Sequence, residues 1–159
     1  PQAPRAPAPG TATRSTGAPG AGAGGEPIDV RDVRRRIQHL MSRRASIRRT
    51  ADGLHQGLTE LAALTARPWD ARDTGPEFLA ETENIALVAE MILAACAVRT
   101  ESRGPHLTFD PPDAATPLPR LDPEWQRYLV ICRGGGDRPT IEPQRPIQPD
   151  WRSVGPPSV

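Results

Sequence analysis

The feature that most constrains this sequence is the stretch of residues 85–98, which is apolar on nearly every side. Its fourteen residues contain a single charged residue, Glu90. A helix without a polar face must be surrounded by protein or by lipid. At about 1.5 Å per residue the stretch rises roughly 21 Å, which is short of the roughly 30 Å hydrocarbon core of a bilayer. The sequence therefore predicts the central helix of a small bundle, with no insertion into a membrane.

Proline and glycine are concentrated at the two ends of the chain. Residues 1–27 contain six Pro, six Gly and seven Ala, but no Leu, Ile, Val, Phe or Trp. Because such a segment cannot bury enough apolar surface to offset its ordering entropy, we expect a disordered linker there. Residues 105–159 carry another twelve Pro, which predicts an extended tail over 105–147 and a flexible end over 148–159. The compact part is then residues 28–104, whose core is marginal for a domain standing alone.

Apolar stripes with helical spacing predict two further helices. The first covers residues 28–44, and the second begins after Thr50 as N-cap and ends near Pro68. The third helix is expected over 77–102, because Gly104 and the proline after it form a helix stop. The stripes consist of Val30, Val33, Ile37, Leu40 and Met41 in the first helix, and of Leu54, Leu58, Leu61 and Leu64 in the second. Two glycines in the second helix cost about 1 kcal/mol each relative to Ala, unless close packing requires them.

The region after the helices has the composition of a short β-hairpin. Residues 124–133 are rich in aromatic and β-branched side chains, residues 134–137 read Gly-Gly-Gly-Asp, and residues 140–142 can return as a second strand. Pro143 and Pro146 are expected to stop that strand. The predicted fold class is mainly α: a three-helix bundle with a C-terminal extended segment or short β-hairpin, preceded by a disordered Pro/Gly/Ala-rich linker.

The charges give no strong signal for nucleic acid or for an anionic membrane, because the net charge is only +1. Arginine is nevertheless concentrated in residues 31–49, where eight arginines face one acidic residue, Asp32. This pattern is compatible with a basic helix that binds RNA or acidic lipid, or with a solvated or interdomain face. No aromatic side chain interleaves the arginines to stack on bases, which favours the second interpretation.

Neither cysteine suggests a metal site. Cys96 and Cys132 lack metal-ligand spacing, so we expect two buried free thiols in a reducing compartment, and no metal. No signal peptide opens the chain, which predicts a cytoplasmic location. Residues 20–25 match G-x-G-x-x-G, but a low-complexity tract precedes them instead of a strand. We interpret the match as chance and expect no cofactor to be bound by this chain alone.

Polar residues gather where the apolar stretch ends: Glu101, Ser102, Arg103 and His106. One interpretation is that Glu101 and Arg103 make polar contacts that fix the helix end against a neighbouring surface. The other is an active site in which Arg103 and His106 bind an anionic substrate. The sequence supplies no nucleophile, carboxylate pair or phosphate loop to join them, so we favour the first interpretation and assign no catalytic residue.

The same residues carry a resemblance to a known family. Residues 99–106, R-T-E-S-R-G-P-H, resemble the E-S-R-G-x-H segment in the C-terminal helical domain of the succinate dehydrogenase/fumarate reductase flavoprotein superfamily. Residues 107–112, L-T-F-D-P-P, are similar to the run that follows the motif in L-aspartate oxidases. Residues 125–129, W-Q-R-Y-L, are similar to a segment found after the motif. Leu107 and Pro111 depart from the usual aromatic residues. The resemblance covers about residues 30–147.

The resemblance implies a parent enzyme that oxidises a small dicarboxylate or amino dicarboxylate by hydride transfer to FAD. The aspartate-oxidase branch further implies a role in NAD biosynthesis. The resemblance assigns no flavin-binding or catalytic residue to this sequence. It implies that one set of motif positions fixes the helical domain onto the flavin-binding domain of the parent, or onto a separate flavoprotein chain: Glu101, Ser102, Arg103, Gly104 and His106. The alternative function is a stand-alone interaction module whose arginine-rich first helix binds an acidic partner or RNA.

Overall fold

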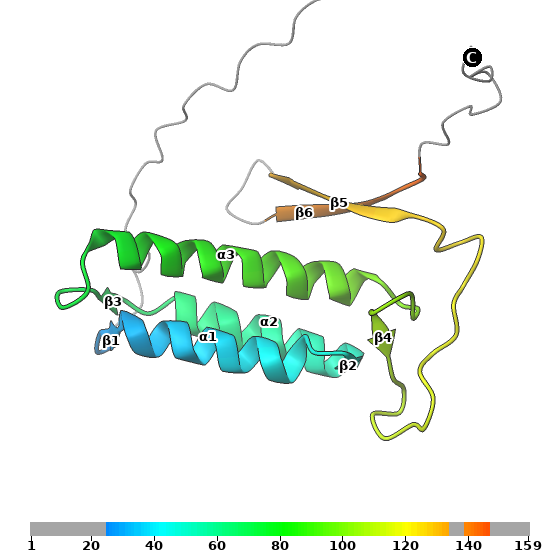
Figure 1. Ribbon diagram of the computed structural model, residues 1–159, viewed down its shortest axis with the longest axis horizontal. Coiled ribbons are helices and arrows are strands. Elements are labelled where there is room, and N and C mark those ends of the chain that lie inside the picture. Colours follow the sequence, from blue (N-terminus) through cyan, green and yellow to red (C-terminus); the bar gives the residue numbers. More distant parts are fainter. Residues whose placement is uncertain (1–24, 134–138, 147–159) are drawn as a thin grey trace, which may run out of the picture.

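A bundle of three helices forms the body of the molecule (Figure 1). The structure is a computed structural model that describes residues 25–133 and 139–146. The helices are α1 (Val30–Arg44), α2 (Ala51–Thr65) and α3 (Pro76–Val98). Side chains of Asp29 and Thr50 cap the first two helices by accepting hydrogen bonds from the amides of Arg31 and Gly53. The mainly helical fold class is confirmed.

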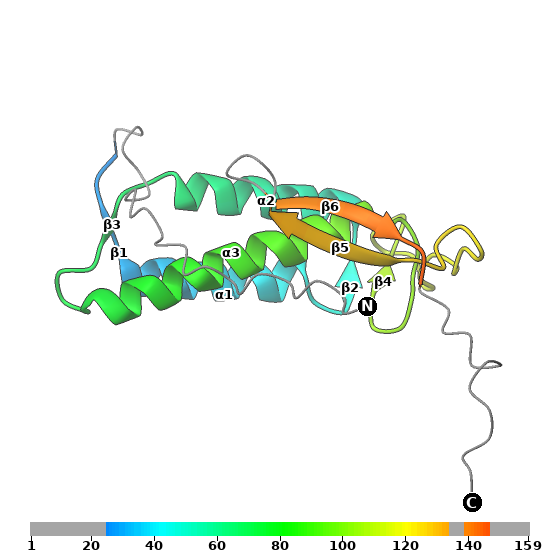
Figure 2. The ribbon, with the colours of Figure 1, turned by 90° about the horizontal axis from the view of Figure 1, so that it is seen from above.

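A β-hairpin lies over the C-terminal half of α3, on the side away from α1 and α2 (Figures 1 and 2). It consists of β5 (Tyr128–Arg133) and β6 (Pro139–Gln144), which pair antiparallel with Ile131 opposite Ile141. The predicted hairpin is therefore confirmed. The sequence had suggested that Pro143 stops the second strand, but β6 continues through Pro143 to Gln144. Proline is tolerated there because β6 is an edge strand, whose outer side needs no amide donor.

Two very short parallel pairs close the ends of the bundle, and the sequence analysis did not predict either. At one end β1 (Ile28–Asp29) pairs with β3 (Trp69–Asp70). At the other end β2 (Arg48–Arg49) pairs with β4 (Leu107–Thr108). The second pair holds the segment after α3 against the connection between α1 and α2. Figure 1 shows it at the end of the bundle where α3 finishes.

The core is made by the apolar stripes of all three helices. The predicted stripes of α1 and α2 point inward, and α3 contributes its face of small and branched residues. The most deeply buried side chains include Ile37, Leu54 and Leu93. The whole core cluster comprises Ile28, Val33, Ile37, Leu40, Leu54, Leu61, Leu64, Ala86, Ala89 and Leu93.

Helix α2 packs closely against its neighbours at Gly57, one of its two glycines. A Cβ atom built on Gly57 would lie 3.0 Å from Leu93 Cδ2 and 3.1 Å from Arg44 Cβ. Both distances are shorter than ordinary carbon–carbon contacts, so the glycine allows α2 to approach α1 and α3 closely. We therefore expect packing to offset its cost in helix propensity, as a substitution below tests.

The third helix is shorter than predicted. It ends at Val98, and Arg99 already has an extended backbone with φ −83° and ψ 115°. The prediction of a helix to residue 102 was wrong because Glu101 and Ser102 turn their side chains into buried polar contacts that a continued helix could not make. Gly104, with φ +56°, serves the turn that follows.

The apolar stretch within α3 is only partly covered by this chain. Leu87 and Val88 are each 46% exposed and Ile92 is 41% exposed. The expectation that protein surrounds this helix on every side is therefore not met by the described residues alone. Within the part of the chain that the structure describes, no helix is long and apolar enough to span a bilayer.

Several predictions concern residues outside this description. The linker expected over 1–27 falls mostly on residues 1–24, the hairpin turn on residues 134–137, and the flexible end on residues 148–159. Residues 25–27 have no regular secondary structure. The proposed division of the chain into linker, bundle, extended tail and end stays a prediction.

Candidate functional site

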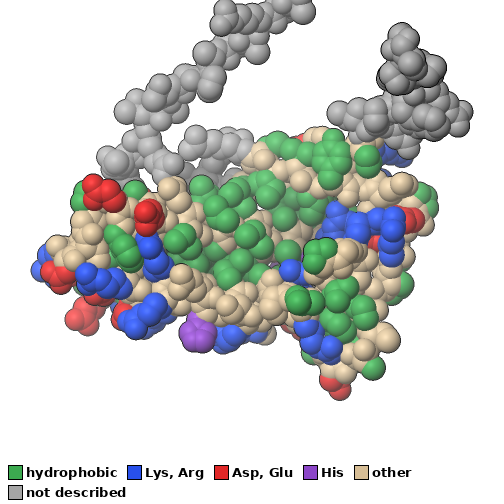
Figure 3. All heavy atoms as spheres, in the orientation of Figure 1, with side chains coloured by type: hydrophobic (Ala, Val, Ile, Leu, Met, Phe, Trp, Pro, Cys, Tyr) green, Lys and Arg blue, Asp and Glu red, His purple; other side chains and the backbone are tan. Residues whose placement is uncertain are grey.

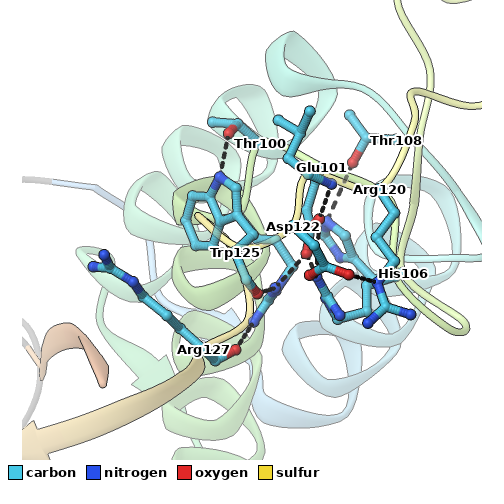
Figure 4. A network of polar contacts seen from close by, with 11 residues as sticks. Thr100, Glu101, His106, Thr108, Arg120, Asp122, Trp125 and Arg127 are labelled. Atoms are coloured by element: carbon cyan, nitrogen blue, oxygen red, sulfur yellow. Dashed lines mark hydrogen bonds and ion pairs between the residues drawn. The ribbon is translucent and has the colours of Figure 1, made fainter. Parts of the chain in front are cut away.

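Glu101 is the centre of a polar cluster just beyond α3 (Figure 4). Its side chain is fully buried. One carboxylate oxygen accepts hydrogen bonds from Arg99 Nη1 at 2.9 Å and from Arg103 Nε at 2.5 Å. The other oxygen accepts from the backbone amide of Leu121 at 2.5 Å and from Arg103 Nη2 at 3.2 Å. Both oxygens are thus satisfied within the chain, as a buried carboxylate requires.

These contacts keep Glu101 ionised despite its burial. Burial alone would raise the pKa of the carboxyl group. The hydrogen bonds from Arg103 and from the Leu121 amide outweigh that effect and hold the pKa below its ordinary value of 4.5. At neutral pH the cluster therefore contains a negative charge between two guanidinium groups.

Arg103 is neutralised by two carboxylates. In addition to Glu101 it pairs with Asp122, with 2.5 Å between Nη2 and Oδ1. Asp122 also pairs with Arg120, and its pKa is lowered first of all by the hydrogen bond from Arg103. Arginines and carboxylates thus alternate through the cluster. The guanidinium of Arg103 is oriented by its neighbours and already has anionic partners, which argues against its use as an anchor for an anionic substrate.

Arg99 connects the end of α3 to the start of the hairpin. Its Nη2 donates to the carbonyl oxygen of Arg127 at 2.8 Å, directly before β5. Its guanidinium also lies 5.1 Å from the centre of the Trp125 ring, within the range of a cation–π contact. The Trp125 indole N–H in turn donates to Thr100 Oγ1 at 3.0 Å. One side chain thereby links Glu101 to the segment that positions β5.

The remaining motif residues form a tight turn. The backbones of Arg103 and His106 exchange two hydrogen bonds, of 2.8 and 3.1 Å. Ser102 Oγ accepts from the amide of Thr108 at 3.0 Å, so the turn leads directly into β4. Arg49 donates to the carbonyl of Pro105 at 3.0 Å. The turn is consequently tied to the connection between α1 and α2.

His106 is half-buried beside this turn and does not join the carboxylate cluster. Its Nε2 lies 3.2 Å from the hydroxyl of Thr108. Burial, followed by the nearby positive charge of Arg49, lowers the pKa of His106 below its ordinary value of 6.5. These surroundings therefore favour the neutral form of the imidazole. The arrangement does not direct His106 and Arg103 together onto one substrate.

The sequence identified Glu101 and Arg103 but missed most of their partners. Asp122 and the Leu121 amide come from a loop about twenty residues later, where no periodic pattern indicates proximity. The one available signal was the alternation of Arg99, Glu101 and Arg103, which in an extended backbone places all three side chains on the same side.

Two features of the described residues bear on the binding of a metal or a dinucleotide. Among residues 25–133 and 139–146, no group of three or more His, Cys, Asp or Glu side chains could bind a metal ion. Both cysteines are free and half-buried. The strand–helix unit β1–α1 carries a carboxylate, Asp29, at the N-terminus of its helix. That position would have to receive the pyrophosphate of FAD, which the carboxylate would repel. This unit does not fit the cofactor.

Comparisons with known proteins place the fold in a family. The family described as the fumarate reductase flavoprotein C-terminal region matches residues 34–154. An L-aspartate oxidase of Halalkalibacterium halodurans is 37% identical over 75 residues, or 47% of this chain and 13% of that protein. An L-aspartate oxidase of Streptomyces coelicolor is 30% identical over 112 residues, or 66% of this chain and 18% of that protein.

A solved structure shows the same fold. It is described as "E. coli Quinol fumarate reductase FrdA E245Q mutation", and it is similar to this chain with a TM-score of 0.59 at 22% sequence identity. The similarity covers 79% of this chain and 22% of the other. The fold and the polar turn thus define the C-terminal helical part of a flavoprotein. The chain belongs to the fumarate reductase flavoprotein C-terminal family, and it spans less than a fifth of the length of the curated relatives that it matches.

Proposed function

We propose that this chain is the C-terminal helical domain of an FAD-dependent oxidoreductase that resembles L-aspartate oxidase. The parent enzyme would oxidise a small dicarboxylate or amino dicarboxylate by hydride transfer to FAD. The family match and the two L-aspartate oxidase relatives support this proposal. A cytoplasmic location and a role in NAD biosynthesis stay predictions that follow from it.

Within the parent we assign this chain a structural role. The observation that carries the assignment is the internal satisfaction of the motif around Glu101. Each oxygen of that carboxylate is bonded to groups of this chain, and Arg103 is paired with two carboxylates. Groups that are paired in this way hold the end of α3, the turn and the hairpin together. The direct contact of motif residues with a flavin domain stays a prediction.

Flavin content tests the proposal. The purified chain should be colourless, whereas the complete polypeptide encoded by its gene should show flavin absorbance and reduce its flavin on addition of L-aspartate or succinate. Flavin that stays with this chain through gel filtration would refute the structural role. A complete polypeptide that contains no flavin would refute the enzyme assignment.

The alternative function, binding of RNA or an acidic partner by α1, is less well supported. A groove of about 1010 Å³ between α1 and α2 is lined by Arg35, Arg36 and Arg43 among others. However, Arg35 pairs with Asp32, and Arg43 pairs with Glu60 at 2.9 Å. These ion pairs reduce the positive potential that such binding requires. Salt-sensitive binding of a single-stranded RNA to the purified chain would favour the alternative.

A further inference from the structure

An uncharged groove runs between α1 and α3 on the face of the molecule shown in Figure 3, where hydrophobic side chains gather over α3 and toward α1. It has a volume of about 510 Å³. Among the residues that the structure describes, no charged side chain lines it. Its walls are made by Ile37, Gln38, Met41, Ser42, Asn84, Ile85, Val88, Ala89 and Ile92.

The groove runs along one face of α3 that the described residues leave uncovered. Elsewhere α3 packs on α1 and α2 and beneath the hairpin, although Leu87, outside the groove, is also 46% exposed. Val88 and Ile92, one turn apart on the groove side, remain 46% and 41% exposed. A helix that is apolar all round is characteristic of the interior of a larger protein. A contiguous apolar surface of this kind indicates a contact with more protein.

We propose that this groove is the docking site for the flavin-binding part of the same flavoprotein, which inserts uncharged, apolar side chains between α1 and α3. This inference rests on the proposed function and names the surface at which the two parts of the enzyme would meet. The curated relatives extend far beyond the matched region, since this chain covers 13% and 18% of their lengths. The remainder of such a parent enzyme is joined to this domain in one polypeptide, so it is always available to contact the groove.

The chemistry of the groove selects that occupant. Because its lining carries no charge, an acidic peptide or a nucleic acid finds no cation there. The polar cluster around Glu101 is a poorer docking site, because its charges already have partners within the chain. The cluster and the groove therefore have different roles. The cluster holds the domain together, and the groove joins the domain to the rest of the parent enzyme.

Methionine oxidation in the complete flavoprotein tests the inference, because the chain contains only two methionines and both are half-buried. Met41 lines the groove, whereas Met91 lies on α3 outside it. The complete flavoprotein is treated with hydrogen peroxide, and the rate of sulfoxide formation at each methionine is measured by mass spectrometry. We expect Met41 to react at least tenfold more slowly than Met91 in the complete protein, and at a rate similar to Met91 in this chain alone.

Two neighbouring substitutions provide the matched comparison. Leu87 and Val88 are equally exposed on α3, but only Val88 lines the groove. Val88→Glu, or Ile92→Glu as a second variant, should bring the oxidation rate of Met41 in the complete protein to that of Met91. Leu87→Glu should leave Met41 protected.

Equal oxidation of both methionines in the unmodified complete protein would overturn the inference. Protection of Met41 in this chain alone, rising with its concentration, would assign the groove to a second copy and also overturn it. The flavin absorbance of the same samples reports on the proposed function separately. A flavin-containing protein with an unprotected Met41 rejects only the groove, whereas a flavin-free protein rejects the enzyme assignment.

Discussion

Glu101 is the residue on which the region beyond α3 depends most. It is fully buried, and its carboxylate joins Arg99, Arg103 and the backbone of Leu121. Removal of one partner from a buried ionic cluster leaves the other charges uncompensated, which costs far more than the loss of a surface ion pair. The motif residue with the greatest effect on stability should therefore be this carboxylate.

We expect Glu101→Gln to lower the free energy of unfolding of the purified chain by about 3 kcal/mol, the lower end of the range for breaking a buried pair, because the two arginines partly reach solvent. Urea unfolding followed by circular dichroism measures the change. The exposed residue Glu124 provides the control, and Glu124→Gln should stay within about 0.5 kcal/mol of the unmodified chain. If the two variants were equally stable, the cluster would not hold the structure together.

His106 predicts the pH dependence of stability near neutrality. Its pKa is lower in the folded chain than its ordinary value of 6.5, so the unfolded chain binds a proton first as the pH falls. This contribution to stability is complete above pH 6.5 and is lost as the pH falls below 6.5 through the lower pKa of the folded state. The urea midpoint should therefore decrease between pH 7.5 and pH 5.5, and His106→Gln should reduce that decrease. An identical decrease in the variant would show that other groups cause it.

Among the elements, regular periodicity was sufficient to predict α1 and α2, because their apolar stripes become the buried residues of the core. Sequence reasoning failed where long-range contacts decide the structure. Helix α3 ends at Val98 instead of continuing, because the following residues satisfy buried polar groups. The pairs β1–β3 and β2–β4 are two residues long, and such pairs leave no pattern in the sequence.

The same distinction applies to the candidate site. The motif was recognisable from consecutive residues, but Asp122 joins it from a distant loop with no periodicity. The sequence indicated a core that is marginal for a domain standing alone, but it did not indicate which strip of α3 is exposed, since hydrophobicity alone does not tell which part of a protein covers a helix. Features that depend on neighbouring residues, such as the motif, could be predicted from the sequence. Contacts between distant segments could be seen only in the structure.

The packing of α2 against its neighbours leads to a prediction at Gly57. Helix propensity alone favours Gly57→Ala by roughly 1 kcal/mol. The added methyl group would crowd Leu93 and Arg44, at about 3 Å from each. We expect overpacking to dominate and to destabilise the chain by about 1–2 kcal/mol in urea unfolding. Thr59→Ala, at an exposed position of the same helix, should be neutral or stabilising. An increase in stability for Gly57→Ala would show that the helices can separate without cost.

The molecule as a whole combines a polar cluster whose charges are paired within the chain with an apolar surface that the described residues leave exposed. The cluster around Glu101 fixes α3, the turn and the hairpin relative to one another. The groove between α1 and α3 leaves Val88 and Ile92 exposed, as expected of a part that is completed by more protein. Together these features fit the proposed structural role, in which this domain supports a flavin-binding part of the parent enzyme.

The temperature at which the complete flavoprotein releases FAD tests this account most directly, because free FAD is recognised by its increased fluorescence. Val88→Glu should lower the release temperature measurably, since the loss of docking free energy destabilises the flavin-containing protein. Leu87→Glu should change it little, and neither substitution should alter the absorbance spectrum of the bound flavin. An unchanged release temperature for Val88→Glu, or an altered flavin spectrum, would contradict the account.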